Sequence, residues 1–333
     1  METIKHFNSI LHSFKINASC VNFNTIDNYL YYDIMLNDKT KVKDIVKYFD
    51  ELSLALKMPN KPSLKILHNE GLVRLEFFSH RKKALNLFDI FTNNNIPDGE
   101  INCLLGKSPD GQNVWMDLSK NPHMLVAGTT GSGKSILLHT IIANLFNYNK
   151  VKLNLIDPKR IEFSEYENKI ISSNLEVRYT YPDTLDKLDE LIDAMEQRYS
   201  DIRSGYKISN MPPIVLIIDE FADLILQDQG DLFYRKLCML AQKCRAAKIY
   251  IILGTQRPSV NIVNGTIKAN FPARIACKTA SYTDSKVILD SSGAEDLLGK
   301  GDALLKDNFR TSERFQIAYR NSEEVCKYFA EVQ

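Results

Sequence analysis

The sequence predicts an α/β fold with a mainly parallel sheet, and three observations predict it. A short apolar run at 124–127 leads through a glycine-rich turn into an apolar helix over 136–146. A second apolar run at 214–218 ends in two acids, as is typical of a buried parallel strand that delivers carboxylates to its carboxyl end. Further strand-like runs at 151–156 and 249–253 complete the alternation of strands with helical segments.

Composition indicates an ordinary globular protein. The chain has 333 residues, of which 44% are hydrophobic and 25% are charged, and its formal net charge is +1. This length favours two domains. No run approaches the roughly 18 apolar residues of a membrane span, and residues 1–15 lack the apolar core of a signal peptide. We therefore expect a cytoplasmic protein without membrane insertion.

The six cysteines are scattered and contain no C-x-x-C pair. This spacing suits neither a disulfide framework nor a zinc site, so we expect reduced and mostly buried thiols. No histidine or cysteine cluster has metal-ligand spacing.

Residues 1–96 are expected to form a small α+β domain. A strand is predicted over 29–36, and apolar residues within 42–56 recur at helical spacing. Segments 63–68 and 72–78 resemble the two strands of a hairpin. No residue of this domain suggests catalysis, and its role is left open between positioning or assembly and simple packing.

The boundary between the two domains is expected in the loop-forming stretch Asn93–Gly99. The second domain then spans 97–333. Its first elements are two short strands within 101–118 around a turn at 108–111. The lone Trp115 is expected to serve packing, with a base-stacking platform as the alternative.

A phosphate-binding loop is predicted by Gly128-x-x-x-x-Gly133-Lys134-Ser135 between a strand and a helix. Glycines allow backbone N–H groups to converge on phosphate oxygens at the helix N-terminus. Lys134 would place its charge on the β- and γ-phosphates of ATP, and Ser135 would offer a hydroxyl to Mg²⁺. The residues expected to bind the nucleotide are Gly128, Thr129, Thr130, Gly131, Ser132, Gly133, Lys134, Ser135 and Ile136.

Three further residues are expected to complete an ATP hydrolysis site. Asp219 would join Ser135 in the shell of Mg²⁺, and Glu220 would position or deprotonate the attacking water. Gln256 follows the strand at 249–253 and would sense the γ-phosphate, although it could also be a capping residue. The polar segment 157–160 should lie beside the nucleotide, with a plain turn as the alternative.

Basic residues gather in the second half of the chain. A helix is predicted over 183–206, and Arg203 and Lys207 at its end could face DNA. The stretch 232–283 contains no acid, which favours contact with a polyanion over a solvated face of mixed charge. Its nine cations are Arg235, Lys236, Lys243, Arg245, Lys248, Arg257, Lys268, Arg274 and Lys278.

Taken together, these segments resemble the motor region of the FtsK/SpoIIIE DNA translocases. The resemblance covers most of the chain, with residues 1–96 resembling the smaller α domain of that family. It is carried by Pro122–Ser135, Leu155–Lys159, Ile218–Leu224, Arg245–Ala247, Thr255–Val260, Ile267–Ala276 and Ser292–Asp302.

The resemblance implies a RecA-like core that forms a ring, usually hexameric, around double-stranded DNA, with ATP between subunits. Asp219 and Glu220 then take the metal and base roles, and Gln256 couples hydrolysis to motion. An arginine should reach the neighbouring subunit's site, with Arg274 as the first candidate and Arg245 as the second. The residues expected to contact DNA are Arg203, Lys207, Lys243, Arg245 and Lys268.

The chain also departs from the large members of that family. It has neither their membrane spans and long linker at the start nor their winged-helix domain at the end, and Ser322–Cys326 looks like the last helix of the motor itself. We therefore expect a stand-alone motor of a phage, plasmid or integrated element, with little sequence preference.

Three functions remain open from the sequence. The leading hypothesis is an ATP-driven translocase on double-stranded DNA, with DNA packaging or conjugative coupling as variants of it. A related ATPase that drives polypeptide export is the second, and the acid-free basic stretch disfavours it. A nucleotide-gated DNA-binding or scaffold protein is the third, and the intact Lys134, Asp219 and Glu220 disfavour it.

Overall fold

A computed structural model describes residues 2–26, 29–37, 39–78, 85–87, 97, 99–146, 148, 151–169, 174–228, 231–310 and 312–332. The chain forms two compact units. The first consists of Met1–Ala84, Lys107–Gln112 and Asp296–Leu298, and the second contains the rest. Most of the linker expected at 93–99 lies outside the described residues.

The first unit is an antiparallel sheet with helices. Its four strands lie in the order β1-β2-β4-β3, and each neighbouring pair is antiparallel. The elements are α1 (Glu2–Ser13), β1 (Ala18–Ile26), β2 (Tyr29–Leu36), α2 (Val42–Val46), α3 (Phe49–Ala55), β3 (Ser63–Leu67) and β4 (Leu72–Phe78). The strand expected over 29–36 and the hairpin of 63–68 with 72–78 are confirmed, whereas the helical spacing of 42–56 belongs to two short helices.

Aromatic side chains hold α1 against this sheet. Phe7 of α1 stacks on Tyr32 of β2 with ring centroids 4.2 Å apart, and both are buried. Arg74 of β4 lies opposite Asp33 of β2 and donates to it at 2.6 Å. Because Asp33 is buried, this pair satisfies a charge that would otherwise be costly to desolvate.

The second unit is built on a ten-stranded sheet in the order β6-β5-β14-β13-β12-β7-β11-β10-β8-β9. The strands from β12 to β9 in this order are parallel, while β13 and β14 extend the sheet in antiparallel fashion. The strands are β5 (Asn102–Lys107), β6 (Asn113–Asp117), β7 (His123–Ala127), β8 (Lys152–Ile156), β9 (Leu175–Arg178), β10 (Ile214–Ile218), β11 (Ile249–Thr255), β12 (Ala273–Cys277), β13 (Asp302–Lys306) and β14 (Glu313–Ile317). The predicted α/β fold with a mainly parallel sheet is therefore confirmed.

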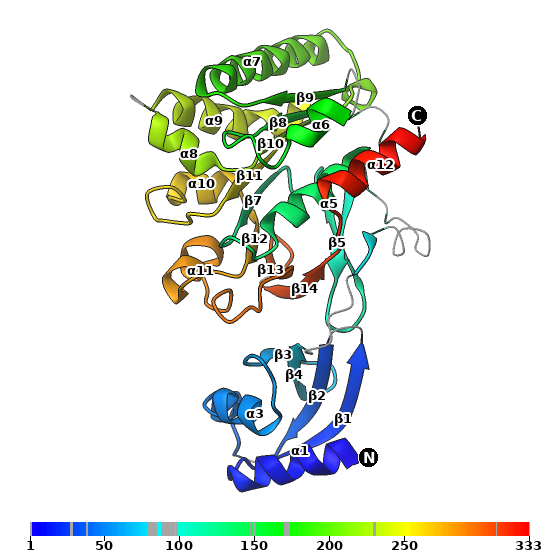
Figure 1. The fold of residues 1–333 in the computed structure, drawn as a ribbon, viewed down its shortest axis with the longest axis vertical. Coiled ribbons are helices and arrows are strands. Elements are labelled where there is room, and N and C mark those ends of the chain that lie inside the picture. Colours follow the sequence, from blue (N-terminus) through cyan, green and yellow to red (C-terminus); the bar gives the residue numbers. More distant parts are fainter. Residues whose placement is uncertain are drawn as a thin grey trace. The chain divides into compact units, whose positions relative to one another are not determined.

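Helices cover both faces of this sheet (Figure 1). On one face α5 and α12 lie together with α6, and on the other lie α8 to α11, with α7 packed on α9. The helices are α5 (Lys134–Phe146), α6 (Ser164–Lys169), α7 (Tyr181–Arg203), α8 (Phe221–Gln227), α9 (Leu232–Lys243), α10 (Gly265–Asn270), α11 (Tyr282–Leu289) and α12 (Ser322–Val332), with short 3₁₀ turns η1 (Ile208–Asn210) and η2 (Cys244–Ala247).

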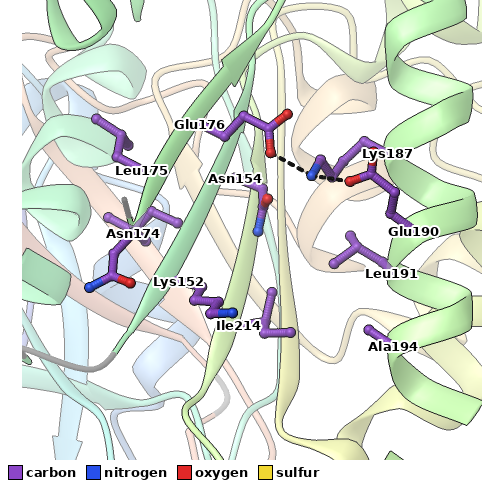
Figure 2. Close-up of a pocket in the computed structure, with 11 residues that line it drawn as sticks. Lys152, Asn154, Asn174, Leu175, Glu176, Lys187, Glu190, Leu191, Ala194 and Ile214 are labelled. Carbon is purple, nitrogen blue, oxygen red and sulfur yellow. Dashed lines mark hydrogen bonds and ion pairs between the residues drawn. The ribbon is translucent and has the colours of Figure 1, made fainter. Parts of the chain in front are cut away.

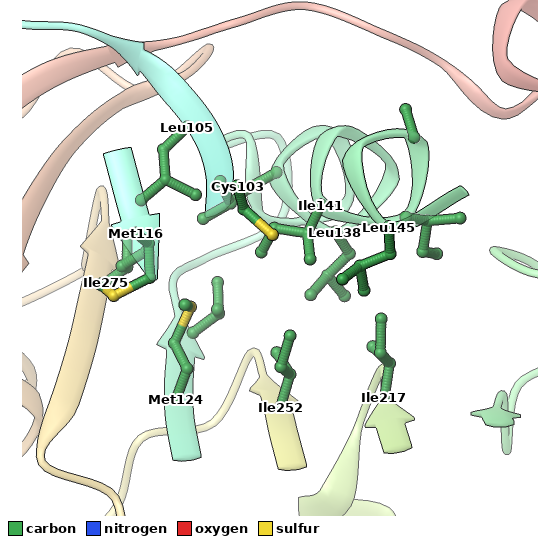
Figure 3. Close-up of a cluster of buried hydrophobic side chains, with 14 of the residues drawn as sticks. Cys103, Leu105, Met116, Met124, Leu138, Ile141, Leu145, Ile217, Ile252 and Ile275 are labelled. Atoms are coloured by element: carbon green, nitrogen blue, oxygen red, sulfur yellow. The ribbon is translucent and has the colours of Figure 1, made fainter. Parts of the chain in front are cut away.

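The central core lies between α5 and the parallel strands. Figure 3 shows Leu138 and Ile141 of α5 facing Met124, Ile252 and Ile217 from three neighbouring strands. All five side chains are completely buried. Burial of each side chain of this size contributes about 1.5–3 kcal/mol. This packing explains why α5 is apolar, and it fixes the helix directly behind the phosphate-binding loop.

The predictions for the cysteines and for Trp115 are confirmed. All six cysteines are buried and free, and Trp115 packs, partly buried, against the core. Among the described residues, none of the helices combines the length and apolar character that crossing a membrane would need.

Candidate functional site

The carboxyl ends of four parallel strands bring the expected catalytic residues together. β10 pairs with β8 and with β11, so that Ile218 lies beside Ile156 and Leu253. β7 in turn pairs with β11, so that its last residue, Ala127, lies beside Thr255. The phosphate-binding loop, Asp157, Asp219 and Gln256 therefore follow neighbouring strands at one edge of the sheet, where α/β sheets bind ligands.

Two glycines of the phosphate-binding loop are required by its backbone. Gly131 and Gly133 have φ angles of +75° and +115°, which side chains disfavour. A Cβ atom at Gly133 would lie 2.6 Å from the backbone nitrogen of Gly301. That nitrogen donates to the carbonyl of Ser132 at 2.8 Å. The segment before β13 thus holds the loop in shape, a contact that the motif itself did not predict.

Lys134 forms a buried ion pair with Asp219. Its ammonium donates to the Asp219 carbonyl at 2.8 Å and to the Oδ1 atom of the same residue. Lys134 is 3% exposed and Asp219 is fully buried. The two residues assigned to phosphate and metal are therefore in direct contact with each other in this structure.

Buried carboxylate oxygens beside this pair suit a magnesium ion. Asp219 Oδ2 and Asp157 Oδ1 are buried and accept no hydrogen bond. Burial together with the Asp219 charge raises the pKa of Asp157. Mg²⁺ prefers oxygen ligands and is usually held by one or two carboxylates together with substrate phosphates and water. The described residues contain no cluster of three or more histidine, cysteine or acidic ligands.

Ser135 contacts a carboxylate that sequence reasoning missed. Its hydroxyl donates to Glu162 Oε1 at 2.7 Å. The other oxygen of Glu162 lies 3.6 Å from His139 Nε2. The His139 and Ser135 contacts lower the pKa of Glu162. Nothing in the local sequence marks this acid, since it belongs to the loop after β8 and meets Ser135 only through the fold.

Glu220 is completely buried and held by three donors. Its carboxylate accepts from the Thr255 hydroxyl at 2.7 Å and from the Gln256 backbone nitrogen at 3.0 Å. The Lys159 ammonium lies 3.2 Å from its Oε2 atom. Burial disfavours the charged form of Lys159, but the charge and hydrogen bond of Glu220, together with the charges of Asp223 and Asp219, raise the pKa of Lys159. The segment after β8 thus lies beside the site, as expected.

Gln256 links this carboxylate to the phosphate-binding loop. Its side-chain oxygen accepts from the Thr130 hydroxyl at 2.9 Å, while its backbone nitrogen contacts Glu220. A cavity of about 200 Å³ opens beside it, with Thr129, Thr279 and Asp284 in its wall. A ligand bound at the loop would therefore act directly on Gln256, which follows the last residue of β11.

Arg274, the first candidate to reach a neighbouring subunit, is held by several contacts within its own chain. It is buried, at 8% exposure. Its guanidinium donates to the carbonyls of Phe271, Ile288 and Lys268 and to Asp290 at 2.5 Å. These contacts favour a structural role for Arg274, and its contact with a neighbouring subunit stays a prediction. Arg245, the second candidate, is exposed in η2.

Replacing Arg274 with alanine is expected to lower the free energy of unfolding by about 1–3 kcal/mol, because buried carbonyls lose their donor. Urea denaturation followed by circular dichroism measures this change. Arg203→Ala, which removes an exposed arginine, is the matched control and should leave stability unchanged. Unchanged stability of Arg274→Ala with loss of ATP turnover would instead favour the role between subunits.

In the fold, acids from other segments offset part of the positive charge of the acid-free stretch 232–283. Four of its cations pair with acids from outside the stretch, which neutralise part of its field. These pairs are Lys236–Asp189, Lys248–Glu100, Lys268–Asp290 and Arg274–Asp290. The other expected DNA contacts, Arg203, Lys207, Lys243 and Arg245, are exposed. Lys268 is therefore the weakest of the expected contacts.

A second cavity, of about 260 Å³, lies between β8, β9 and α7 (Figure 2). Figure 2 shows Lys187 of α7 between Glu176 of β9 and Glu190 of its own helix. Arg178 also binds both acids, at 2.5 and 2.7 Å. These charges neutralise one another, and none of the lining residues belongs to the phosphate-binding loop. This cavity is therefore separate from the candidate site.

Comparison with known proteins decides the family. A model of the FtsK/SpoIIIE family matches residues 92–206 and 202–260. DNA translocase FtsK of Leptospira interrogans is 37% identical over 318 residues, covering 87% of this chain and 33% of that protein. The chain belongs to the FtsK/SpoIIIE family. FtsK of Borreliella burgdorferi is 34% identical over 99% of the chain and 44% of that protein, and SpoIIIE of Bacillus subtilis is 34% identical over 89% and 41%. The chain thus spans less than half the length of these family members.

Solved structures agree with this FtsK/SpoIIIE assignment at the level of fold. The pCW3 conjugation coupling protein TcpA, solved with ATPγS, aligns over 100% of both chains with a TM-score of 0.69 and 22% identity. The type VII secretion ATPase EccC of Thermomonospora curvata aligns over 74% of this chain and 34% of its own, with a TM-score of 0.61 and 20% identity. The P-loop ATPase fold of the chain is thereby confirmed.

Proposed function

We propose that this chain hydrolyses ATP with Mg²⁺ and uses the energy to move double-stranded DNA. The observation that carries the proposal is the convergence of Lys134, Asp219, Glu220 and Gln256 at one edge of the sheet. Curated relatives at 34–37% identity are named DNA translocases, which favours DNA as the cargo.

In the proposed reaction, the residues of this chain exchange internal contacts for contacts to ATP. Lys134 leaves Asp219 and takes a phosphate oxygen, while the glycine-rich loop presents backbone N–H groups. Ser135 and Asp219 would hold Mg²⁺, which neutralises charge on the phosphates. Glu220 then accepts a hydrogen bond, and finally a proton, from the attacking water.

Coupling to movement would begin at Gln256. Its side chain contacts Thr130 and its backbone contacts Glu220, so hydrolysis at the loop changes both contacts together. We further propose that copies of the chain form a ring, hexameric in the simplest case, with ATP between subunits. Arg245, exposed in η2, is then the candidate to contact the neighbouring nucleotide.

Binding to DNA is proposed to rest on backbone phosphates and to carry little sequence preference. Arg203, Lys207, Lys243 and Arg245 are exposed and supply the positive charge. Affinity for a long duplex should fall steeply between low and physiological salt, because phosphate contacts release counterions. Fluorescence anisotropy of labelled duplex across a salt series measures this dependence.

Removing two of these charges should flatten that dependence. Arg203→Ala/Lys207→Ala is expected to reduce the slope of log affinity against log salt by roughly one for each phosphate that the variant no longer neutralises. Lys5→Ala/Lys43→Ala removes two exposed lysines of the first unit and is the matched control. Affinity that does not respond to salt would contradict binding through phosphates.

Movement itself is tested with a duplex to which a third DNA strand is bound as a triplex, at a site far from the ends of the duplex. A translocase displaces that strand only when ATP is hydrolysed, whereas a static binding protein leaves it in place. Displacement by the intact chain and none by Glu220→Gln would support the proposal. ATP turnover stimulated by polypeptides, without strand displacement, would instead favour export of a polypeptide.

A further inference from the structure

Glu162 is held in one position by the loop that carries it. The loop follows β8 and turns at Arg160, whose backbone nitrogen donates to the Asp157 carbonyl at 3.1 Å. The Asp157 side chain then accepts from the Phe163 nitrogen at 2.9 Å. Glu162 lies between these two anchored points, so its carboxylate is presented to α5 in a defined place.

Two residues one helical turn apart on α5 contact this carboxylate. Ser135 donates to Oε1 at 2.7 Å, and His139 Nε2 lies 3.6 Å from Oε2. His139 is buried, and its other ring nitrogen lies 2.8 Å from the Tyr166 hydroxyl of α6. The carboxylate is therefore fixed at both oxygens, and its histidine contact is fixed in turn by Tyr166.

The hydrogen bond to Glu162 decides which way the Ser135 hydroxyl points. Ser135 is the donor in this bond, at 2.7 Å to Glu162 Oε1, and the other oxygen of Glu162 lies beside His139. A hydroxyl has one donor and two acceptor lone pairs. The Ser135 proton must therefore point at Glu162, which leaves both lone pairs directed elsewhere.

We propose that Glu162 is a positioning residue, which orients the Ser135 hydroxyl so that its lone pairs face the Mg²⁺ of the nucleotide site. This inference rests on the proposed function, since it assigns a residue to the metal shell of the same site. Partners that orient metal ligands in this way act through the ligand, and their removal typically lowers metal affinity by about 10- to 100-fold.

The test measures nucleotide binding rather than turnover. Affinity for a fluorescent ATP analogue is determined with Mg²⁺ and with a chelator, and their ratio reports how much the metal contributes. In Glu162→Ala this ratio is expected to fall by about 10- to 100-fold, while affinity without Mg²⁺ stays unchanged. A residue that merely supported the fold would lower both affinities together.

Further variants complete the experiment. Glu167→Ala removes another acid of the same region, exposed and bonded to Tyr179, and should leave the ratio unchanged. Ser135→Ala should match Glu162→Ala, and the double variant should lose no more than either single variant, because both changes act through one contact. Glu162→Gln keeps an acceptor oxygen without the charge and should give an intermediate ratio.

The outcomes separate this inference from the proposed function. If the intact chain binds the analogue equally well with and without Mg²⁺, the proposed magnesium site itself is wrong. If the intact chain shows the gain and Glu162→Ala keeps it, Glu162 does not position Ser135. Should Glu162→Ala fail to fold in a thermal melt, the comparison of Glu162→Gln with Ser135→Ala decides, since a Gln variant equal to the intact chain overturns the inference.

Discussion

Lys134→Ala is expected to lower ATP turnover by at least about 100-fold, because the variant loses a charged donor aimed at the transferring phosphate. The same change removes the partner of Asp219, whose carboxylate is completely buried. Breaking a buried ion pair from one side costs about 3–5 kcal/mol of stability. Steady-state turnover and urea denaturation of the same preparation measure the two effects.

The double variant Lys134→Ala/Asp219→Asn separates catalysis from folding. Neutralising Asp219 removes the uncompensated charge, so stability should recover toward that of the intact chain while turnover stays lost. Recovery of turnover in the double variant would contradict the role of Lys134 at the phosphates. A single variant as stable as the intact chain would contradict the buried pair seen in the structure.

Glu220→Gln is expected to lower ATP turnover by about 10²- to 10⁴-fold, the usual contribution of a positioned general base. Nucleotide affinity should change little, because Glu220 contacts Thr255, Gln256 and Lys159 rather than the phosphate-binding loop. Single-turnover kinetics together with a binding measurement distinguish a slower chemical step from weaker binding.

Asp223→Asn is the matched control for this variant. Asp223 also pairs with Lys159, at 3.7 Å, while Glu220 does so at 3.2 Å. Both variants remove one negative charge from the same lysine, but only Glu220 bonds to the end of β11. Turnover of Asp223→Asn should therefore stay near that of the intact chain. Equal losses in both variants would attribute the effect to the Lys159 charge.

Local sequence patterns predicted the parts of the site that are continuous in the chain. The phosphate-binding loop and the strand before Asp219 have patterns set by backbone geometry and burial. A few consecutive residues are therefore enough to identify each of them. Glu162 gave no such signal, since it meets the loop only through tertiary contacts. Gly301 belongs to a segment that carries the family resemblance, but its contact with the loop arises only in the fold. The α/β architecture followed from the same short patterns.

Local sequence patterns do not determine which residues become partners across the fold. The family resemblance makes Arg274 the first candidate for an arginine that reaches a neighbouring subunit. In the fold it is buried against Asp290, which lies beyond the acid-free stretch. Charge along a sequence does not determine which acids fold back upon it, and the same reason explains the ion pair of Lys268.

The antiparallel strands β13 and β14 were also not predicted, because each is short and bounded by irregular segments.

The measurement that tests the central claim most directly is steady-state ATP hydrolysis by the intact chain, with and without long linear duplex DNA. A DNA-dependent motor should show strong stimulation by the duplex, and Lys134→Ala and Glu220→Gln should abolish it. Robust hydrolysis that is indifferent to duplex DNA would contradict a DNA translocase, while activity that survives in Lys134→Ala would contradict the assigned site.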